Sequence, residues 1–119
     1  MIGIDIASVA RIEKSIKNDA FISRVFTQKE QAYCNGRQRP AESYAGIFCA
    51  KEAAAKAIKR GFTGGLKPID IEVDHDDNGV PLLVFYGNAG QVFSKFDADV
   101  SISHDGDYAV AAVMLRLKN

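Results

Sequence analysis

The sequence predicts one compact domain that combines helices with antiparallel β-hairpins. Three observations lead to this fold class. The chain has 119 residues, 47% of them hydrophobic, which is enough for one core but not for two ordinary domains. An alanine-rich stretch over residues 41–61 has the composition of a long helix. Residues 69–86 and 99–117 change instead to the two-residue hydrophobic period of strands, interrupted by turns. We therefore expect a single domain over residues 1–119.

A first strand is predicted at the N-terminus. Three isoleucines alternate there with Gly3, Asp5 and Ala7 over residues 2–7. We expect the isoleucines to be buried. The opposite face then carries one carboxylate between two small residues, which leaves room for a ligand beside Asp5.

Helix signals follow this strand. Ser8 is a suitable N-cap for a helix that starts with the next residue, and Arg11, Lys14 and Lys17 give that helix a basic exposed stripe. A second short helix should include residues 21–26.

A third helix should begin with a capping box, in which Thr27 and Glu30 satisfy each other's backbone groups. It should fray near residues 35–36. The alanine-rich helix over residues 41–61 comes next, with a positive last turn and Gly61 as its stop signal.

The second half of the chain predicts two hairpins and a short helix. The glycine-rich residues 61–67 lack the Gly-Lys-Ser/Thr ending of a phosphate-binding loop, so we interpret them as a connection. Strands 69–73 and 80–86 flank a turn at 77–79, and a helix over 88–96 follows. Strands 99–104 and 108–117 form the second hairpin, whose last strand is apolar on both faces.

Apolar runs and cysteines limit the class of protein. No apolar run approaches the roughly 20 residues of a membrane-spanning helix. The N-terminus begins as a folded strand rather than a cleavable signal, so we expect a cytoplasmic protein that binds no membrane. Cys34 and Cys49 have no C-x-x-C spacing, and we expect both to be small apolar fillers rather than disulfide partners or ligands.

Charge is unevenly spread along a chain whose formal net charge is zero. Residues 11–60 contain eleven Lys or Arg and five Asp or Glu, an excess of six positive charges, and the remainder carries the opposite six. A protein that wraps nucleic acid is usually basic overall, so we expect no nucleic-acid partner. A basic half suits a discrete acidic partner or a phosphate-bearing ligand, and a solvated helix surface is the alternative.

One segment imitates a metal site. Residues 74–79 have the Asp-x-Asp-x-Asn-Gly spacing that begins a calcium-binding EF-hand loop. Position twelve of such a loop should be a bidentate glutamate, but it is Phe85 here, and strands flank the segment. We therefore expect no calcium site, and we expect His75 to be solvent-exposed.

Two carboxylates form the candidate site. Glu52 lies on an otherwise apolar helical stripe, where a charge needs a partner. Lys56, one turn on, could supply an ordinary i,i+4 ion pair, and Asp5 could be a simple outward residue of an edge strand. Taken together, the two acids suit magnesium, which is held by one or two protein carboxylates, waters and substrate phosphates. His104, at a strand end, could reach a phosphate or sugar or be structural.

The chain resembles the holo-acyl-carrier-protein synthases, the small bacterial type of phosphopantetheinyl transferase. Three segments carry the resemblance: GIDIASVARI at 3–12, SYAGIFCAKEAAAKA at 43–57 and SISHDGDYAVA at 101–111. It implies an α+β fold, with an antiparallel sheet packed on a long helix. It also implies a homotrimer that binds coenzyme A between subunits, and transfer of phosphopantetheine from coenzyme A to a carrier-protein serine in fatty acid biosynthesis.

The resemblance also implies roles for individual residues. Asp5 and Glu52 would hold Mg²⁺ with the pyrophosphate, and Glu52 and Lys56 would be catalytic. Glu52 is our candidate general base for the serine's proton, directly or through a metal-bound water. Its pKa should be low because it ligates the metal, which favours the route through water. Lys56 would lie beside the phosphates, and His104 near the adenosine end. Coenzyme A would contact Lys51, Lys56, Gly61, Pro81 and His104, and the carrier protein would contact Arg11, Phe21 and Arg24.

Two departures from the family pattern concern cations. The family often has arginine where Ile47 stands, and Lys59-Arg60-Gly61 replaces the usual Gly-Thr-Gly. Lys59 and Arg60 could compensate by approaching the nucleotide phosphates. Two other classes of function stay open from the residues alone. One is a noncatalytic adaptor for an acidic partner, and the other is a magnesium-dependent phosphohydrolase.

Overall fold

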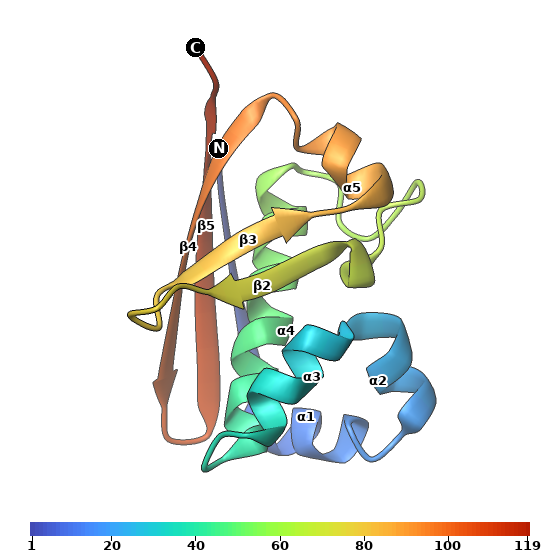
Figure 1. The fold of residues 1–119 in the computed structure, drawn as a ribbon, viewed down its shortest axis with the longest axis vertical. Coiled ribbons are helices and arrows are strands. Elements are labelled where there is room, and N and C mark those ends of the chain that lie inside the picture. Colours follow the sequence, from blue (N-terminus) through green and yellow to red (C-terminus); the bar gives the residue numbers. More distant parts are fainter.

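The computed structural model describes all residues 1–119 (Figure 1). The chain contains five strands, five α-helices and one short 3₁₀ helix, in this order: β1 (Ile2–Ser8), α1 (Val9–Ser15), α2 (Asp19–Val25), α3 (Gln28–Asn35), α4 (Pro40–Ala57), η1 (Pro68–Asp70), β2 (Ile71–His75), β3 (Pro81–Phe85), α5 (Gly87–Val92), β4 (Phe96–Asp105) and β5 (Tyr108–Leu117). The predicted α+β class and both hairpins are confirmed.

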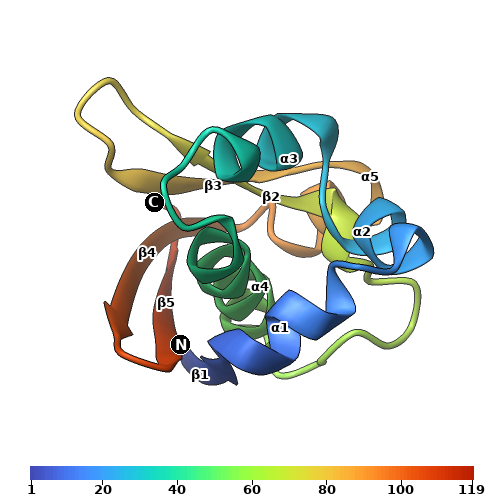
Figure 2. The ribbon, with the colours of Figure 1, turned by 90° about the horizontal axis from the view of Figure 1, so that it is seen from below.

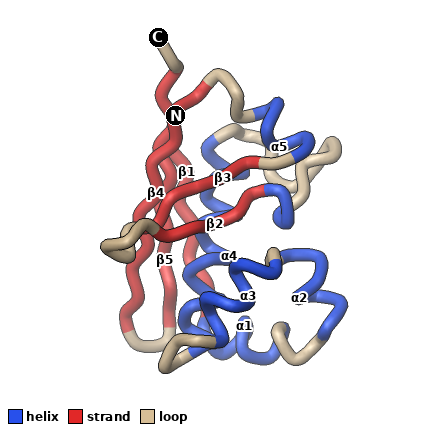
Figure 3. Tube along the Cα trace, in the orientation of Figure 1, coloured by secondary structure: helices blue, strands red, loops and turns tan.

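The strands form two antiparallel sheets on either side of α4. The larger sheet has the order β1-β5-β4, and β2 pairs with β3 in a second sheet. Seen almost end-on in Figure 2, α4 lies at the centre, with β4 and β5 on one side and β2 and β3 on another. Helices α1, α2 and α3 gather near the beginning of α4 (Figure 3). Because α4 is covered from several directions, it carries much of the core.

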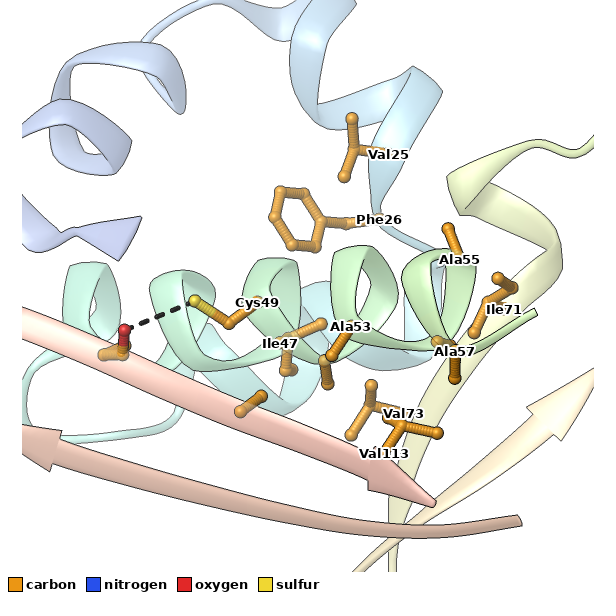
Figure 4. Packing of buried hydrophobic residues seen from close by; sticks show 14 of the residues in the cluster. Val25, Phe26, Ile47, Cys49, Ala53, Ala55, Ala57, Ile71, Val73 and Val113 are labelled. Atoms are coloured by element: carbon orange, nitrogen blue, oxygen red, sulfur yellow. Dashed lines mark hydrogen bonds between the residues drawn. The ribbon is translucent and has the colours of Figure 1, made fainter. Parts of the chain in front are cut away.

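Small residues let α4 and the larger sheet approach closely. Ala53, Ala54 and Ala57 of α4 are fully buried. A Cβ built on Gly3 would lie 2.0 Å from the Ala53 carbonyl oxygen, so only glycine fits at this crossing. Figure 4 shows buried hydrophobic side chains packed around α4, including Ala53, Ala57 and Cys49. The Cys49 thiol donates to the Ala109 carbonyl at 3.4 Å.

Both cysteines are free and fully buried, which confirms the filler prediction. Burial is the main reason that the pKa of each thiol is raised to about 12.

The burial predicted for β1 is wrong. Ile2, Ile4 and Ile6 are 65%, 62% and 62% exposed, whereas Gly3 is buried and Asp5 is half-buried. The strand turns its small residues towards α4 because the helix leaves no room for larger side chains at that distance. Size, rather than hydrophobicity, has decided which face packs.

The helix caps agree well with prediction, whereas two helix ends do not. The Ser8 side chain accepts from the Arg11 backbone, and the capping box at Thr27 is present. However, α4 ends at Ala57 rather than near Gly61, because Lys59 already adopts a left-handed φ of 63°. Helix α5 ends at Val92, since the chain enters β4 at residue 96. None of the helices is both long and apolar enough to cross a membrane.

Candidate functional site

Asp5 and Glu52 line one groove. Strand β1 carries Asp5 opposite Ala111 of β5, and α4 carries Glu52. The groove has a volume of about 410 Å³ and extends from these acids along α1 to two phenylalanines. Its lining comprises Asp5, Ile6, Ala7, Ser8, Arg11, Ile12, Ser15, Phe21, Phe48 and Glu52. The carboxylates that the sequence singled out therefore share one cavity, together with Arg11 and Phe21. Arg24 is exposed on α2 and does not line it.

Lys56 pairs with Asp5 and not with Glu52. Its Nζ donates to Asp5 Oδ1 at 2.9 Å and to the Ile4 carbonyl at 3.2 Å. The i,i+4 pair considered for Glu52 and Lys56 is therefore wrong. The Lys56 side chain is 54% exposed and the Asp5 side chain 16%, so this ion pair neutralises the carboxylate from its solvent side.

Glu52 is half-buried and makes no hydrogen bond or ion pair with the protein. Burial raises the pKa of its carboxyl group, the negative charge of Asp5 raises it further, and Lys56 lowers it. The low pKa expected of Glu52 as a metal ligand concerns the metal-bound protein and stays a prediction. A half-buried carboxylate without a protein partner, beside a second carboxylate, fits the small oxygen donor set from which Mg²⁺ is held.

His104 and Pro81 line a different cavity, of about 200 Å³. Its lining comprises Tyr33, Arg37, Glu42, Ser43, Gly46, Ile47, His75, Gly79, Pro81, Ile102 and His104. His104 Nε2 lies 3.0 Å from the Glu42 carbonyl, and a Cβ on Gly46 would come within 2.7 Å of that nitrogen. No residue lines both cavities. Within one chain, Pro81 and His104 are therefore separated from the groove that holds the paired acids.

Lys51 cannot make the contact with coenzyme A predicted for it. Its side chain is fully buried, and Nζ pairs with Glu30 Oε1 at 2.8 Å. It also donates to the carbonyls of Pro68 and Ile71, at 2.9 and 2.6 Å. All three hydrogens of the ammonium have partners inside the protein, so this cation is structural.

The loop after α4 carries the remaining predicted residues. Gly61 adopts a φ of 63° and lines neither cavity. Lys59 and Arg60 are exposed, and Arg60 donates to the Gly64 carbonyl at 3.3 Å. Ile47 is buried, 2% exposed, at the edge of the His104 cavity.

Sequence reasoning missed several lining residues. Phe48 precedes Glu52 by one helical turn and lies on the face that the helical period predicts for both, but no role in the groove was predicted for it. The ring of Tyr33 stacks on His75 with centroids 3.9 Å apart. The prediction of an exposed His75 is therefore wrong, because α3 covers the end of β2. These two residues lie far apart in sequence, and no local pattern indicates their contact.

Comparisons with known proteins agree with one another. The family model described as "4'-phosphopantetheinyl transferase superfamily" matches residues 1–113. The holo-[acyl-carrier-protein] synthase of Koribacter versatilis is 43% identical, over 95% of this chain and 94% of its own length. That of Finegoldia magna is 44% identical, over 98% and 96%.

Solved structures give the same result. The holo-[acyl-carrier-protein] synthase of Helicobacter pylori in complex with coenzyme A has a TM-score of 0.86 and 34% identity, covering 98% of this chain and 100% of that one. The Bacillus anthracis holo-(acyl-carrier-protein) synthase, in complex with CoA (3',5'-ADP), has a TM-score of 0.84 and 38% identity, covering 98% and 96%.

Proposed function

This chain belongs to the 4'-phosphopantetheinyl transferase superfamily, and from that premise we propose that it is a holo-[acyl-carrier-protein] synthase. It transfers phosphopantetheine from coenzyme A to a serine of apo-acyl carrier protein. The products are holo-acyl carrier protein and adenosine 3',5'-bisphosphate, in fatty acid biosynthesis. The observation that carries this proposal is the groove in which Asp5 and Glu52 lie together beside the basic helix α1.

Asp5 and Glu52 are the residues that would hold Mg²⁺. The ion prefers oxygen ligands and takes one or two carboxylates from the protein, leaving other positions for waters and substrate phosphates. The unpartnered carboxylate of Glu52 and the adjacent Asp5 support this assignment. When bound, the ion neutralises negative charge on the pyrophosphate of coenzyme A and on the leaving phosphate.

Glu52 and Lys56 are the proposed catalytic residues. The serine oxygen attacks the β-phosphorus of coenzyme A, and the bond from that phosphorus to the adenosine bisphosphate breaks. Glu52 takes the serine's proton, directly or through a water. Burial raises the pKa of this carboxyl group in the metal-free protein, whereas ligation of Mg²⁺ would lower it and favour the route through water. The ammonium of Lys56 is exposed enough to turn towards the phosphate oxygens. Positioning the serine in line with the leaving group supplies much of the rate.

We propose that the active enzyme is a homotrimer with its sites between subunits. Two observations support this assembly. The face of β1 that bears Ile2, Ile4 and Ile6 is exposed and apolar, which is typical of a surface that another chain covers. His104 and Pro81 lie in a cavity separate from the paired acids, and a neighbouring subunit could bring these two groups together around one coenzyme A. Gly61 stays a proposed contact of the nucleotide.

The carrier protein would dock on α1 and α2. Arg11 and Phe21 line the outer part of the groove, and Arg24 is exposed on α2 nearby in the sequence. A basic surface beside an aromatic side chain suits an acidic partner that must deliver a serine to the acids. The localisation stays the cytoplasm, as expected for an enzyme that uses coenzyme A and a carrier protein.

A single incubation tests the function. The protein is mixed with coenzyme A, MgCl₂ and an apo-acyl carrier protein, and the carrier is then weighed by mass spectrometry. We expect the carrier to gain the mass of one phosphopantetheine group. Carrier with its acceptor serine replaced by alanine is the control and should gain none.

Two results would contradict the proposal. Loss of coenzyme A without a mass gain on the carrier would indicate a phosphohydrolase, in which water replaces the serine. No change in either reactant would indicate a noncatalytic adaptor.

A further inference from the structure

Lys56 occupies one oxygen of the Asp5 carboxylate, which a divalent cation would also need. Its Nζ is bonded to Asp5 Oδ1 at 2.9 Å and is held in place by the Ile4 carbonyl at 3.2 Å. Glu52, in contrast, has no protein partner. The groove therefore presents one free carboxylate and one that is already neutralised by a monovalent side-chain cation.

Asp5 is accessible from two sides. On one side lies the groove that it shares with Glu52. On the other lies a shallower, mostly apolar hollow, and Lys56 approaches Asp5 from there; its lining comprises Ile4, Asp5, Ile6, Lys56 and Val110. The Lys56 side chain is 54% exposed and has a flexible four-carbon stem. It can therefore leave Asp5 without disturbing the core.

We propose that Lys56 sets the affinity of the site for its divalent cation by occupying Asp5, and that it releases Asp5 when the phosphates of coenzyme A arrive. The identity of the phosphate-bearing ligand as coenzyme A rests on the proposed function. A divalent cation at Asp5 and an ammonium bonded to the same carboxylate repel each other, because both are positively charged and lie against one side chain. Coenzyme A offers Lys56 phosphate oxygens as a new anionic partner. The cation and coenzyme A then strengthen each other's binding, and linkage requires the effect to be reciprocal.

Titration with Mn²⁺ tests this role without any turnover. Free Mn²⁺ is measured by electron paramagnetic resonance as it is added to the wild-type protein, first alone and then with coenzyme A. We expect weak binding alone and binding that is about 5–150-fold tighter with coenzyme A, the usual range for coupled sites.

The decisive variant is Lys56→Met, which keeps the length of the stem and removes the charge. We expect it to bind Mn²⁺ alone at least about ten-fold more tightly than wild type, because the competing cation is gone. The tightening produced by coenzyme A should shrink by a similar factor. Lys56→Arg keeps the charge and should stay close to wild type.

Lys59→Met is the matched control, since it removes an exposed lysine that has no bond to Asp5. Its affinity for Mn²⁺ alone should stay within about two-fold of wild type, as for a screened distant charge. Equal Mn²⁺ affinity of wild type and Lys56→Met would overturn the proposal. An equal increase in Mn²⁺ affinity in Lys56→Met and Lys59→Met would overturn it as well. If the carrier gains no mass with wild-type protein, the proposed transfer fails, whereas Mn²⁺ binding in the absence of coenzyme A still decides the role of Lys56.

Discussion

Two charged clusters lie next to each other on α4 and differ in how completely their charges are satisfied. Lys51 belongs to a closed cluster with Glu30, in which both side chains are fully buried. The Glu30 oxygens also accept from the backbones of Thr27 and Val73, both within 2.8 Å. Glu52, the next residue, belongs to an open cluster with Asp5 and Lys56, where its own carboxylate has no partner.

The difference separates what holds the fold together from what is free to react. The closed cluster ties α3, α4, η1 and the start of β2 together, and none of its donors or acceptors remains for a ligand. The open cluster keeps a half-buried carboxylate unpaired, which leaves an oxygen for a metal or a proton. Adjacent residues of one helix thus have different tasks, because their side chains leave it about 100° apart and meet different elements.

The largest expected effect comes from neutralising the open cluster. Glu52→Gln should slow transfer to the carrier by about 10²–10⁴-fold, because the general base and a metal ligand are lost together. Its free energy of unfolding should not fall, since a desolvated charge beside Asp5 is removed. Rates come from the carrier-mass assay and stability from urea denaturation.

Asp5→Asn should slow transfer to the carrier by a similar factor, and sedimentation should show the trimer persisting in both variants. Glu13→Gln, an exposed acid on α1, is the control and should keep full activity. A fully active Glu52→Gln protein would remove Glu52 from the proposed mechanism.

Breaking the closed cluster should cost stability. Lys51→Met leaves Glu30 buried without its cation, and we expect a loss of about 3–5 kcal/mol in the free energy of unfolding. Burial raises the pKa of Glu30 and lowers that of Lys51, so each charge depends on the other. Urea denaturation followed by circular dichroism measures the loss.

The double variant Glu30→Gln/Lys51→Met should recover most of this loss, because it leaves no unpaired charge. Lys29→Met removes a cation of α3 whose ion pair with Asp74 is exposed, and it should cost less than about 1 kcal/mol. If Lys51→Met and Lys29→Met lower the free energy of unfolding by similar amounts, the buried ion pair does not stabilise the fold more than the exposed one.

A smaller effect is expected at the crossing that sets the distance between the two acids. Gly3→Ala places a Cβ against the Ala53 carbonyl, and β1 must move away from α4. We expect a loss of about 1–3 kcal/mol, the range for an overpacked core. Thermal unfolding measures it, together with Mn²⁺ affinity, which should weaken as Asp5 moves away from Glu52. Gly106→Ala, at an open turn with a φ of 58°, strains the backbone without this clash and should leave Mn²⁺ affinity unchanged.

The smallest effect should come from His75, which belongs to neither cluster. Burial lowers the pKa of its imidazole below 6.5, so the folded protein favours the neutral ring. Its contribution to stability is complete above pH 6.5 and is lost as the pH falls through the lowered pKa. We expect the free energy of unfolding to fall by less than about 1 kcal/mol between pH 7.5 and 5.5, because solvent screens the charge at this site. His75→Phe keeps the stack on Tyr33 and should show a smaller decrease; an equal decrease would assign the effect to other groups.

Local patterns predicted most of the elements but not which faces pack. The caps at Ser8 and Thr27 and both hairpins depend on a few neighbouring residues, and they were predicted correctly. The alternation of β1 predicted a strand, but its orientation follows from the close approach of Gly3 to α4. That approach joins segments about fifty residues apart, and no local pattern contains it.

The candidate site shows the same division. Asp5 and Glu52 were singled out because a carboxylate on an apolar or small-residue face is unusual. The roles of Lys51 and Lys56 could not be separated, because both are lysines of one short motif. Their partners, Glu30 and Asp5, come from other elements, so only the assembled fold distinguishes the structural lysine from the one at the site.

The two buried thiols allow the opening of each cluster to be followed by chemical modification. The pKa of Cys34 is raised by burial and by the charge of Glu30, and that of Cys49 by burial and by Asp5 and Glu52. A thiol that is protonated and enclosed does not react with an alkylating reagent until the surrounding structure opens. Timed alkylation followed by peptide mapping would therefore record separately how often the closed side and the open side of α4 come apart, in a protein that needs no added label.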